Sequence, residues 1–105
     1  MREAKILFCG DVCFQHHKNL GPGYAASILS ELKPIFDDAD KVILNLETPL
    51  APAGVGAPIT KSGPALISDP SWINFLDEAG CGLAVMANNH TGDYGDDALA
   101  YTTGL

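Results

Sequence analysis

The sequence predicts an α/β fold, a parallel-sheet β-α-β-α-β-α unit, from two observations. First, three short apolar runs at residues 4–9, 41–46 and 82–87 have the length of strands. Their apolar residues are continuous rather than alternating, which is typical of parallel strands buried on both faces. Second, helix-like segments separate or follow these runs. Strands that alternate with helices form parallel sheets, because each helix returns the chain to the start of the next strand.

The first helix is expected between the first two strands, at residues 24–36. Its apolar residues recur at helical spacing and would share one face. They are Ala25, Ile28, Leu29, Leu32 and Phe36. Pro34 lies within this segment and is expected to end or bend the helix, because proline lacks a backbone N–H and its ring collides with the preceding turn.

Two further helices are expected. Asp69 is a good N-cap for the first of them, and Pro70 suits its first turn. The apolar face of this helix comprises Trp72, Ile73, Leu76 and Ala79. The last helix is expected to begin near Asp96 or Asp97 and to run to the end of the sequence.

A long loop rich in proline, glycine and alanine follows the second strand, at residues 48–64. Lys61 lies in it, either as a solvated surface lysine or as a basic group that closes over a site. A three-stranded parallel sheet has two unpaired edges, and the last helix leads to no further strand. Residues 1–105 are therefore expected to form a single partial domain, the N-terminal part of a larger one. Surface that the rest would cover is expected to favour association.

Composition excludes several classes of protein. Of 105 residues, 47% are hydrophobic and 18% are charged, as in a globular domain. Thirteen acidic residues against six basic ones give a formal net charge of -7, so no nucleic-acid partner is expected. No apolar run reaches the roughly 20 residues of a membrane span. The oligomeric state is left open.

Localisation is left open as well. No signal peptide precedes the first strand, which indicates a cytoplasmic protein, whereas removal of a leader or anchor would instead indicate the cell envelope. The three cysteines include no CxxC pair, and Cys9 and Cys81 are expected to be core thiols. We expect His16 and His17, adjacent in a predicted loop, to be solvated rather than metal-ligating.

Polar side chains follow all three predicted strands. The first leads into GD (10–11), the second ends in NLE (45–47) and the third leads into NNHTGD (88–93). Because the carboxyl ends of parallel strands meet at one edge, where ligands bind, we expect these groups to surround one crevice. Each motif alone is also explained as a turn or a helix cap. Their coincidence at three strand ends favours a site.

Mixed Asp, Glu, Asn and His side chains suit hard or borderline divalent metal ions such as Mn, Fe, Zn or Mg. Two such ions would activate a water molecule and hold the oxygens of a phosphoryl group. They would also offset the repulsion between an anionic substrate and an acidic chain. The pattern therefore predicts a divalent metal site for a phosphoester or polyanionic polymer, without naming the metal or the substrate.

Three stretches carry a family resemblance: ILFCGDV (6–12), VILNLETPLA (42–51) and AGCGLAVMANNHTGDYG (79–95). They resemble the bacterial capsule-synthesis family, the CapA-type proteins linked to poly-γ-glutamate biosynthesis. That family belongs to the calcineurin-like metallophosphoesterase superfamily. The resemblance implies an α/β sandwich around a two-metal centre that hydrolyses phosphoesters, of which this chain would be the N-terminal half.

The resemblance also implies roles for single residues. Asp11 would ligate one metal ion, and Glu47 would be the acidic residue near both ions. Asn89 would ligate the second ion. His90 would face the phosphate, as proton donor to the leaving oxygen or as electrostatic stabiliser.

Two supporting groups, Asn45 and Asp93, would orient the metal ligands. The chain departs from the superfamily where a histidine usually follows the aspartate by two residues, since Cys13 stands there, as is common in CapA-type proteins. The family's later histidine motifs would lie beyond Leu105. The chain is therefore expected to bind metal weakly and to be inactive by itself.

Two other functions are compatible with the same residues. One is a non-catalytic capsule or poly-γ-glutamate assembly factor that keeps the fold and binds polymer or a partner in the crevice. The other is a flavodoxin-like binding domain whose polar strand ends are only turns. The clustered carboxylates favour a phosphoesterase over the flavodoxin-like domain, but they do not separate an enzyme from an assembly factor.

Overall fold

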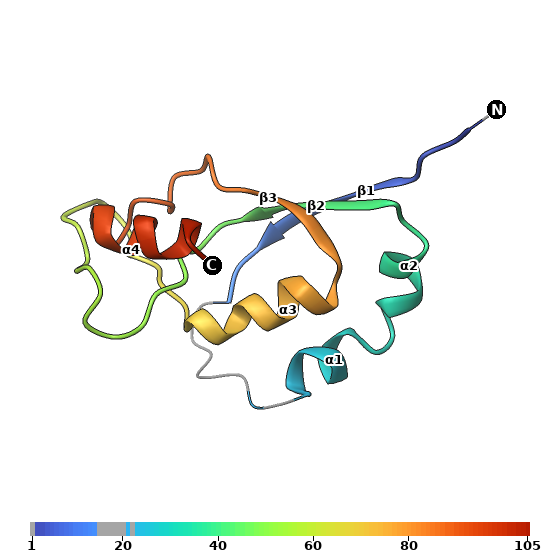
Figure 1. Cartoon of the computed structure of the whole chain (residues 1–105). Coiled ribbons are helices and arrows are strands. Elements are labelled where there is room, and N and C mark those ends of the chain that lie inside the picture. Colours follow the sequence, from blue (N-terminus) through green and yellow to red (C-terminus); the bar gives the residue numbers. More distant parts are fainter. Residues whose placement is uncertain (1, 15–20, 22) are drawn as a thin grey trace.

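Three parallel strands form the sheet (Figure 1). In the computed structural model, which describes residues 2–14, 21 and 23–105, the strands are β1 (Ile6–Val12), β2 (Lys41–Leu46) and β3 (Cys81–Val85). They pair in the order β1-β2-β3, so β2 lies in the centre. The predicted parallel α/β fold is confirmed.

Helices follow each strand, as predicted. They are α1 (Tyr24–Leu29), α2 (Lys33–Asp37), the 3-10 helix η1 (Pro70–Trp72), α3 (Ile73–Glu78) and α4 (Gly95–Thr103). The prediction of one helix at residues 24–36 is wrong, because α1 and α2 are separate elements. Pro34 neither ends nor bends a helix: it lies in the first turn of α2, where its missing N–H leaves no hydrogen bond unmade.

The helix expected after residue 69 forms as a 3-10 turn that continues into α3. The Asp69 side chain accepts a hydrogen bond from the Ser71 backbone N at 2.8 Å, which confirms the predicted N-cap. The last helix begins at Gly95, and Asp96 and Asp97 occupy its first turn. Carboxylates at that end stabilise a helix, because they face its unpaired backbone N–H groups.

The first strand ends later than the sequence predicts. β1 continues to Val12, so Gly10 and Asp11 lie within the strand rather than after it. Phe8 pairs with Ile43 but Asp11 pairs with Asn45, so β1 holds one extra residue between these two pairs. Such an irregularity redirects a side chain, and here it sets Asp11 opposite Asn45 on the neighbouring strand.

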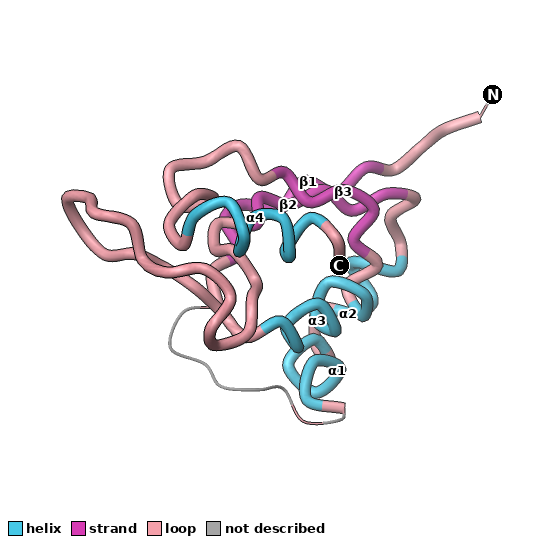
Figure 2. The backbone as a smooth tube through the Cα atoms, turned by 60° about the vertical axis from the view of Figure 1, so that its left-hand side comes forward, coloured by secondary structure: helices cyan, strands magenta, loops and turns pink. Residues whose placement is uncertain are grey.

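Among the residues that the structure describes, helices cover only one face of the sheet. Figures 1 and 2 show α1, α2 and α3 on the same side of the strands, and the long loop extending past the strands' carboxyl ends. Along β2, residues buried on that side alternate with less buried ones. The buried residues are Val42, Leu44 and Leu46.

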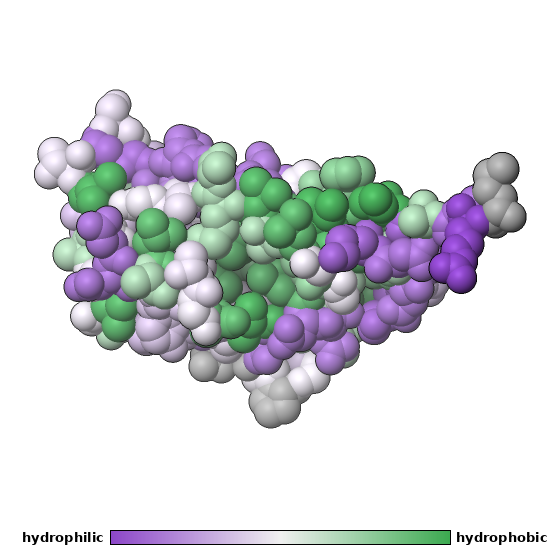
Figure 3. Space-filling view, turned by 45° about the horizontal axis from the view of Figure 1, so that its top comes forward, coloured by the Kyte–Doolittle hydropathy of each residue, from purple (hydrophilic) through white to green (hydrophobic). Residues whose placement is uncertain are grey.

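The prediction that all three strands are buried on both faces is therefore wrong. Apolar side chains of the outer strands are exposed: Ile6 (52%), Phe8 (72%), Leu83 (51%) and Val85 (41%). Figure 3 shows hydrophobic residues gathered across the middle of the sheet face that the helices leave uncovered, with hydrophilic ones around them. Continuous apolar residues are typical of parallel strands covered on both faces, so the apolar pattern of the strands and the exposed face of this sheet disagree.

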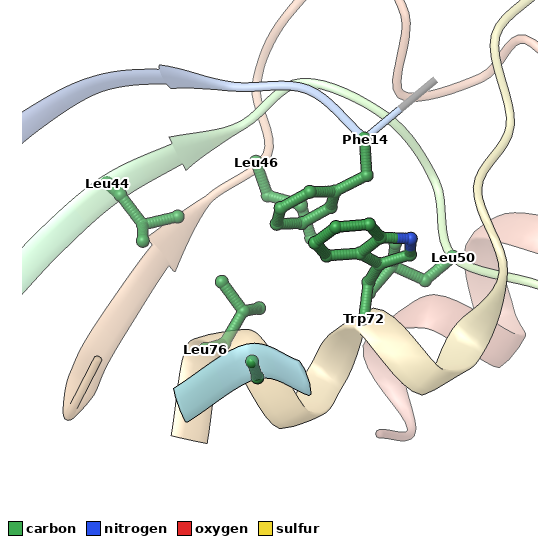
Figure 4. Close-up of a cluster of buried hydrophobic side chains, with 7 residues drawn as sticks. Phe14, Leu44, Leu46, Leu50, Trp72 and Leu76 are labelled. Atoms are coloured by element: carbon green, nitrogen blue, oxygen red, sulfur yellow. The ribbon is translucent and has the colours of Figure 1, made fainter. Parts of the chain in front are cut away.

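The core lies between the covered face of the sheet and the helices (Figure 4). Phe14 stacks on Trp72 of η1, with ring centroids 4.1 Å apart and an interplanar angle of 12°. Leu44 and Leu46 of β2 belong to the same buried cluster. The core therefore fixes the carboxyl ends of β1 and β2, which carry the polar residues of the site.

The cysteines differ in their surroundings. Cys9 and Cys81 pack against the core, as predicted, whereas Cys13 is exposed. Burial raises the pKa of the Cys81 thiol. Within residues 2–14, 21 and 23–105, no helix is long and apolar enough to cross a membrane.

A pair of substitutions on neighbouring strands tests which face carries the core. Leu44→Ala is expected to lower the free energy of unfolding by about 2–5 kcal/mol, because it opens a cavity in the buried cluster. Phe8→Ala removes a larger but mostly exposed side chain and is expected to change it by less than about 1 kcal/mol. Urea unfolding measures both. Equal losses would contradict the one-sided core.

Candidate functional site

A chain of hydrogen bonds links the carboxyl ends of the three strands. Asn45 Nδ2 donates to Asp11 Oδ1 at 2.8 Å, and Asn88 Nδ2 donates to Asn45 Oδ1 at 3.1 Å. Asn88 Nδ2 also lies 2.9 Å from the backbone oxygen of Leu46. Asn88 Oδ1 accepts from the backbone N of His90 at 2.9 Å, which forms an Asx turn. We call Asp11, Asn45 and Asn88 the strand-end chain.

The linking carboxamide is Asn88, a residue of the NNHTGD motif to which the sequence alone assigned no role. Asn89, the predicted metal ligand, is exposed, and among the described residues its side chain is not part of the strand-end chain. The sequence did contain a signal for Asn88. An asparagine directly after a strand readily accepts a hydrogen bond from the backbone N–H two residues later.

The Asp93 carboxylate is fully buried and accepts three hydrogen bonds. Lys61 Nζ lies 2.6 Å from Oδ1, while the Leu66 backbone N and His90 Nδ1 lie 2.7 Å and 2.6 Å from Oδ2. The lysine and the amide are donors only, so the carboxylate is the acceptor and carries the charge. We call Lys61, Leu66, His90 and Asp93 the Asp93 network.

This network determines which ring nitrogen of His90 carries the proton that faces Asp93. Because the ionised Asp93 carboxylate only accepts, Nδ1 of His90 carries the proton between them. The opposite nitrogen, Nε2, lies 3.7 Å from Glu47 Oε1, beyond hydrogen-bond distance. The imidazole therefore stands between two carboxylates, bonded to one and facing the other.

Opposing effects act on the pKa of the Asp93 carboxyl. Burial raises it, because the charged form loses solvation, whereas the hydrogen bonds from Lys61, Leu66 and His90 lower it. The hydrogen bonds prevail, and the pKa lies below its ordinary value. The carboxylate is therefore charged at neutral pH although it is buried.

The long loop packs against the turn that carries Asp93. The Ile59 backbone N donates to Asp93 O at 2.9 Å, and the Ala57 backbone N donates to Tyr94 O at 3.2 Å. Lys61 reaches inward from the same loop, and its side chain is only 19% exposed. The expectation of a solvated surface lysine is therefore wrong. The sequence separates Lys61 and Asp93 by 32 residues, and no local pattern pairs them.

The residues predicted to bind metal lie at one edge of the sheet but do not converge tightly. Throughout the part of the chain that the structure describes, no three His, Cys, Asp or Glu side chains form a group that could hold a metal ion. His16 and His17 lie outside the described residues. The side chains present are oxygen and imidazole donors, which suit hard or borderline divalent ions.

A comparison with protein families supports the family resemblance that was drawn from the strand-end motifs. A family model described as "Bacterial capsule synthesis protein PGA_cap" matches residues 5–105, which is all but the first four residues of the chain. The match spans the strand-end chain and the Asp93 network. A comparison with curated proteins found no match.

The close approach of the loop to the Asp93 turn is tested at Gly56. A Cβ atom there would overlap the backbone oxygen of Tyr94, and the backbone has a φ of +73°. Gly56→Ala is expected to lower the free energy of unfolding by about 2–5 kcal/mol, as the sum of positive-φ strain and overlap. Urea unfolding measures this loss.

Gly54→Ala is the matched control, because Gly54 has a φ of +90° but nothing within 4 Å of the added Cβ. This variant has the positive-φ strain without the overlap, so its free energy of unfolding is expected to fall by only about 1–2 kcal/mol. Equal losses in the two variants would mean that the loop does not press on Tyr94.

The lowered pKa of Asp93 predicts a specific loss of stability in acid. In the unfolded chain an aspartate titrates near a pKa of about 3.9. Above that pH the interactions of the charged Asp93 carboxylate contribute fully to the free energy of unfolding. This contribution is lost as the pH falls through the lower pKa of the folded state. Asp93→Asn is therefore expected to flatten the dependence of unfolding free energy on pH below about pH 4. Identical slopes in urea unfolding of both proteins would contradict this.

Proposed function

The chain belongs to the family of bacterial capsule synthesis proteins, and on this premise we propose that it is part of a metal-dependent phosphoesterase-like domain. The proposal covers the N-terminal portion of such a domain, with further metal ligands supplied by residues outside this chain. Its substrate class is a phosphoester. The premise names the biological setting, while the reaction is inferred from the residues at the strand ends.

One observation carries the proposal: two carboxylates, Asp11 of β1 and Glu47 directly after β2, lie at the same sheet edge as a histidine whose proton position is set. Asp11 bonds to Asn45, and Glu47 lies 3.7 Å from Nε2 of His90. Such a grouping of acidic residues and an imidazole beyond parallel strands is typical of sites that bind ligands. A turn or a helix cap alone does not require a carboxylate facing an imidazole.

Three residues would hold divalent ions in the complete domain: Asp11, Glu47 and Asn89. Their oxygens suit Mn, Fe, Zn or Mg. Bound ions would supply the charge that neutralises a phosphoryl group and would activate water for its hydrolysis. Asn45 would keep the Asp11 carboxylate oriented, because it already donates to Oδ1 and leaves Oδ2 available.

His90 would act on the leaving oxygen. Its Nδ1–H would remain hydrogen-bonded to Asp93, so the nitrogen that can exchange a proton with a substrate is Nε2. In the protonated imidazole, Nε2 would give its proton to the leaving oxygen as the ester bond breaks. The Asp93 carboxylate would stabilise the imidazolium before that transfer, since it holds the opposite nitrogen at 2.6 Å.

Metal content tests the proposal directly. A protein that extends this chain beyond Leu105 is expected to contain about two divalent ions per chain by elemental analysis. Asp11→Asn is expected to lose at least one of them and to reduce hydrolysis of bis(p-nitrophenyl) phosphate by about 100-fold or more. The 105-residue chain alone is expected to bind the ions weakly and to show no turnover.

Asp37→Asn is the matched control, because Asp37 lies on α2, is exposed and pairs only with Lys33 among the contacts described. It is expected to leave metal content and hydrolysis unchanged. Absence of metal from both the extended protein and its variants would refute the phosphoesterase. The crevice would then be assigned to a non-catalytic assembly factor that binds polymer or a partner.

A further inference from the structure

We propose that a cavity beside the long loop binds a small aliphatic ammonium ion. The cavity has a volume of about 460 Å³ and lies between residues 51–56, residues 67–69 and the side chain of Tyr94. Sites for small molecules have volumes of about 300–1,000 Å³. Among the described residues, no member of the strand-end chain or of the Asp93 network lines this cavity. It is therefore a second site, separate from the proposed phosphoesterase centre.

Backbone hydrogen bonds hold the segments around the cavity together. The backbone N of Ala51 donates to Ser68 O at 3.1 Å, and that of Ala57 donates to Tyr94 O at 3.2 Å. Gly56 lies close to α4, and Figure 1 shows the long loop beside that helix. The cavity is therefore formed before a ligand enters, which reduces the entropy that binding would cost.

The Asp69 carboxylate supplies the charge of the cavity and has one oxygen available. Its Oδ1 caps η1 by accepting hydrogen bonds from the backbone N of Ser71, at 2.8 Å, and from the Ser71 hydroxyl. Within residues 2–14, 21 and 23–105, its Oδ2 forms no hydrogen bond or ion pair, although the residue is partly buried. A ligand with an N–H group would therefore find an acceptor there.

The residues that line the cavity favour an organic cation over other ligands. Asp69 is the one charged side chain among the described lining residues, so an anion would be repelled. A single carboxylate is too few ligands for a divalent metal ion, which prefers several oxygens. An ammonium group donates to a carboxylate and is attracted to an aromatic ring, here that of Tyr94. Val55 and Ile67 would cover its carbon chain.

Titration of the 15N-labelled chain with n-butylammonium tests this inference. Spectra that correlate amide 1H and 15N are recorded at about pH 7, where an alkylammonium is charged, and at about 0.15 M salt to screen unspecific attraction. Saturable shifts are expected at the amides of residues 51–56 and 67–69, with a dissociation constant on the order of 1 mM. The uncharged 1-butanol and the anion butanoate have similar carbon chains and are expected to bind at least about tenfold more weakly.

Three variants assign the binding to the cavity. Asp69→Asn removes the charge but keeps the cap of η1, because asparagine caps a helix as well as aspartate does, and it is expected to weaken binding about tenfold or more. Tyr94→Leu removes the ring and is expected to weaken binding about threefold, the scale of a cation–π contact. Asp96→Asn is the matched control, because Asp96 is exposed and does not line the cavity. It is expected to change the affinity less than about twofold.

Three results would overturn the inference: no saturable shift with n-butylammonium, equal affinity for n-butylammonium and 1-butanol, or unchanged affinity in Asp69→Asn. Shifts confined to the residues around Asp11 and Glu47 would also overturn it, because the cation would then bind at the other carboxylates. Urea unfolding checks that Asp69→Asn is folded. If it is not, the comparison of the three probes on the wild-type chain still decides. The metal-content test involves neither Asp69 nor an amine, so either proposal can fail alone.

Discussion

A single buried charge, the carboxylate of Asp93, constrains the region that lies beyond the carboxyl ends of the three strands. An ionised carboxylate out of contact with water is destabilising by several kcal/mol unless it is paired and hydrogen-bonded. Here its partners come from two separate segments, because Lys61 belongs to the long loop, Leu66 directly follows that loop, and His90 belongs to the turn after β3. The loop therefore has to pack against the turn for the carboxylate to be paired, and this turn leads directly into α4.

The strand-end chain depends on the core in a similar way. Leu44 and Leu46 of β2 are buried in the cluster around Phe14 and Trp72, and Asn45 between them points to the other side of the strand. The extra residue in β1 then sets Asp11 opposite Asn45. Rigid, packed elements thus fix the two strand ends, while the segments after β3 bring in Asn88 and His90. Division of labour between a fixed scaffold and functional loops is common in α/β proteins.

The two hydrogen-bonded groups meet at His90. The strand-end chain reaches its backbone N through Asn88, and the Asp93 network reaches its ring through Nδ1. Both the position and the orientation of the imidazole are consequently determined by other residues, as a site that transfers protons requires. The same rigidity would serve an assembly factor, since a fixed imidazole flanked by carboxylates also suits the binding of a partner or polymer. The exposed apolar side chains of β1 and β3 belong to neither network.

The sequence by itself determined the strands, the parallel order of elements and the set of polar residues at the strand ends. These features depend on residues that are close in sequence, because hydrophobic periodicity and turn formation are set by near neighbours. The apolar runs, the Asp69 cap and motifs such as NLE and NNH are examples. Tertiary structure alone decided three things. Helices cover one face of the sheet rather than two, Asn88 rather than Asn89 joins the strand ends, and Lys61 pairs with Asp93. Each is set by contacts between residues far apart in the chain, and a buried ion pair across 32 residues leaves no periodic trace in the sequence.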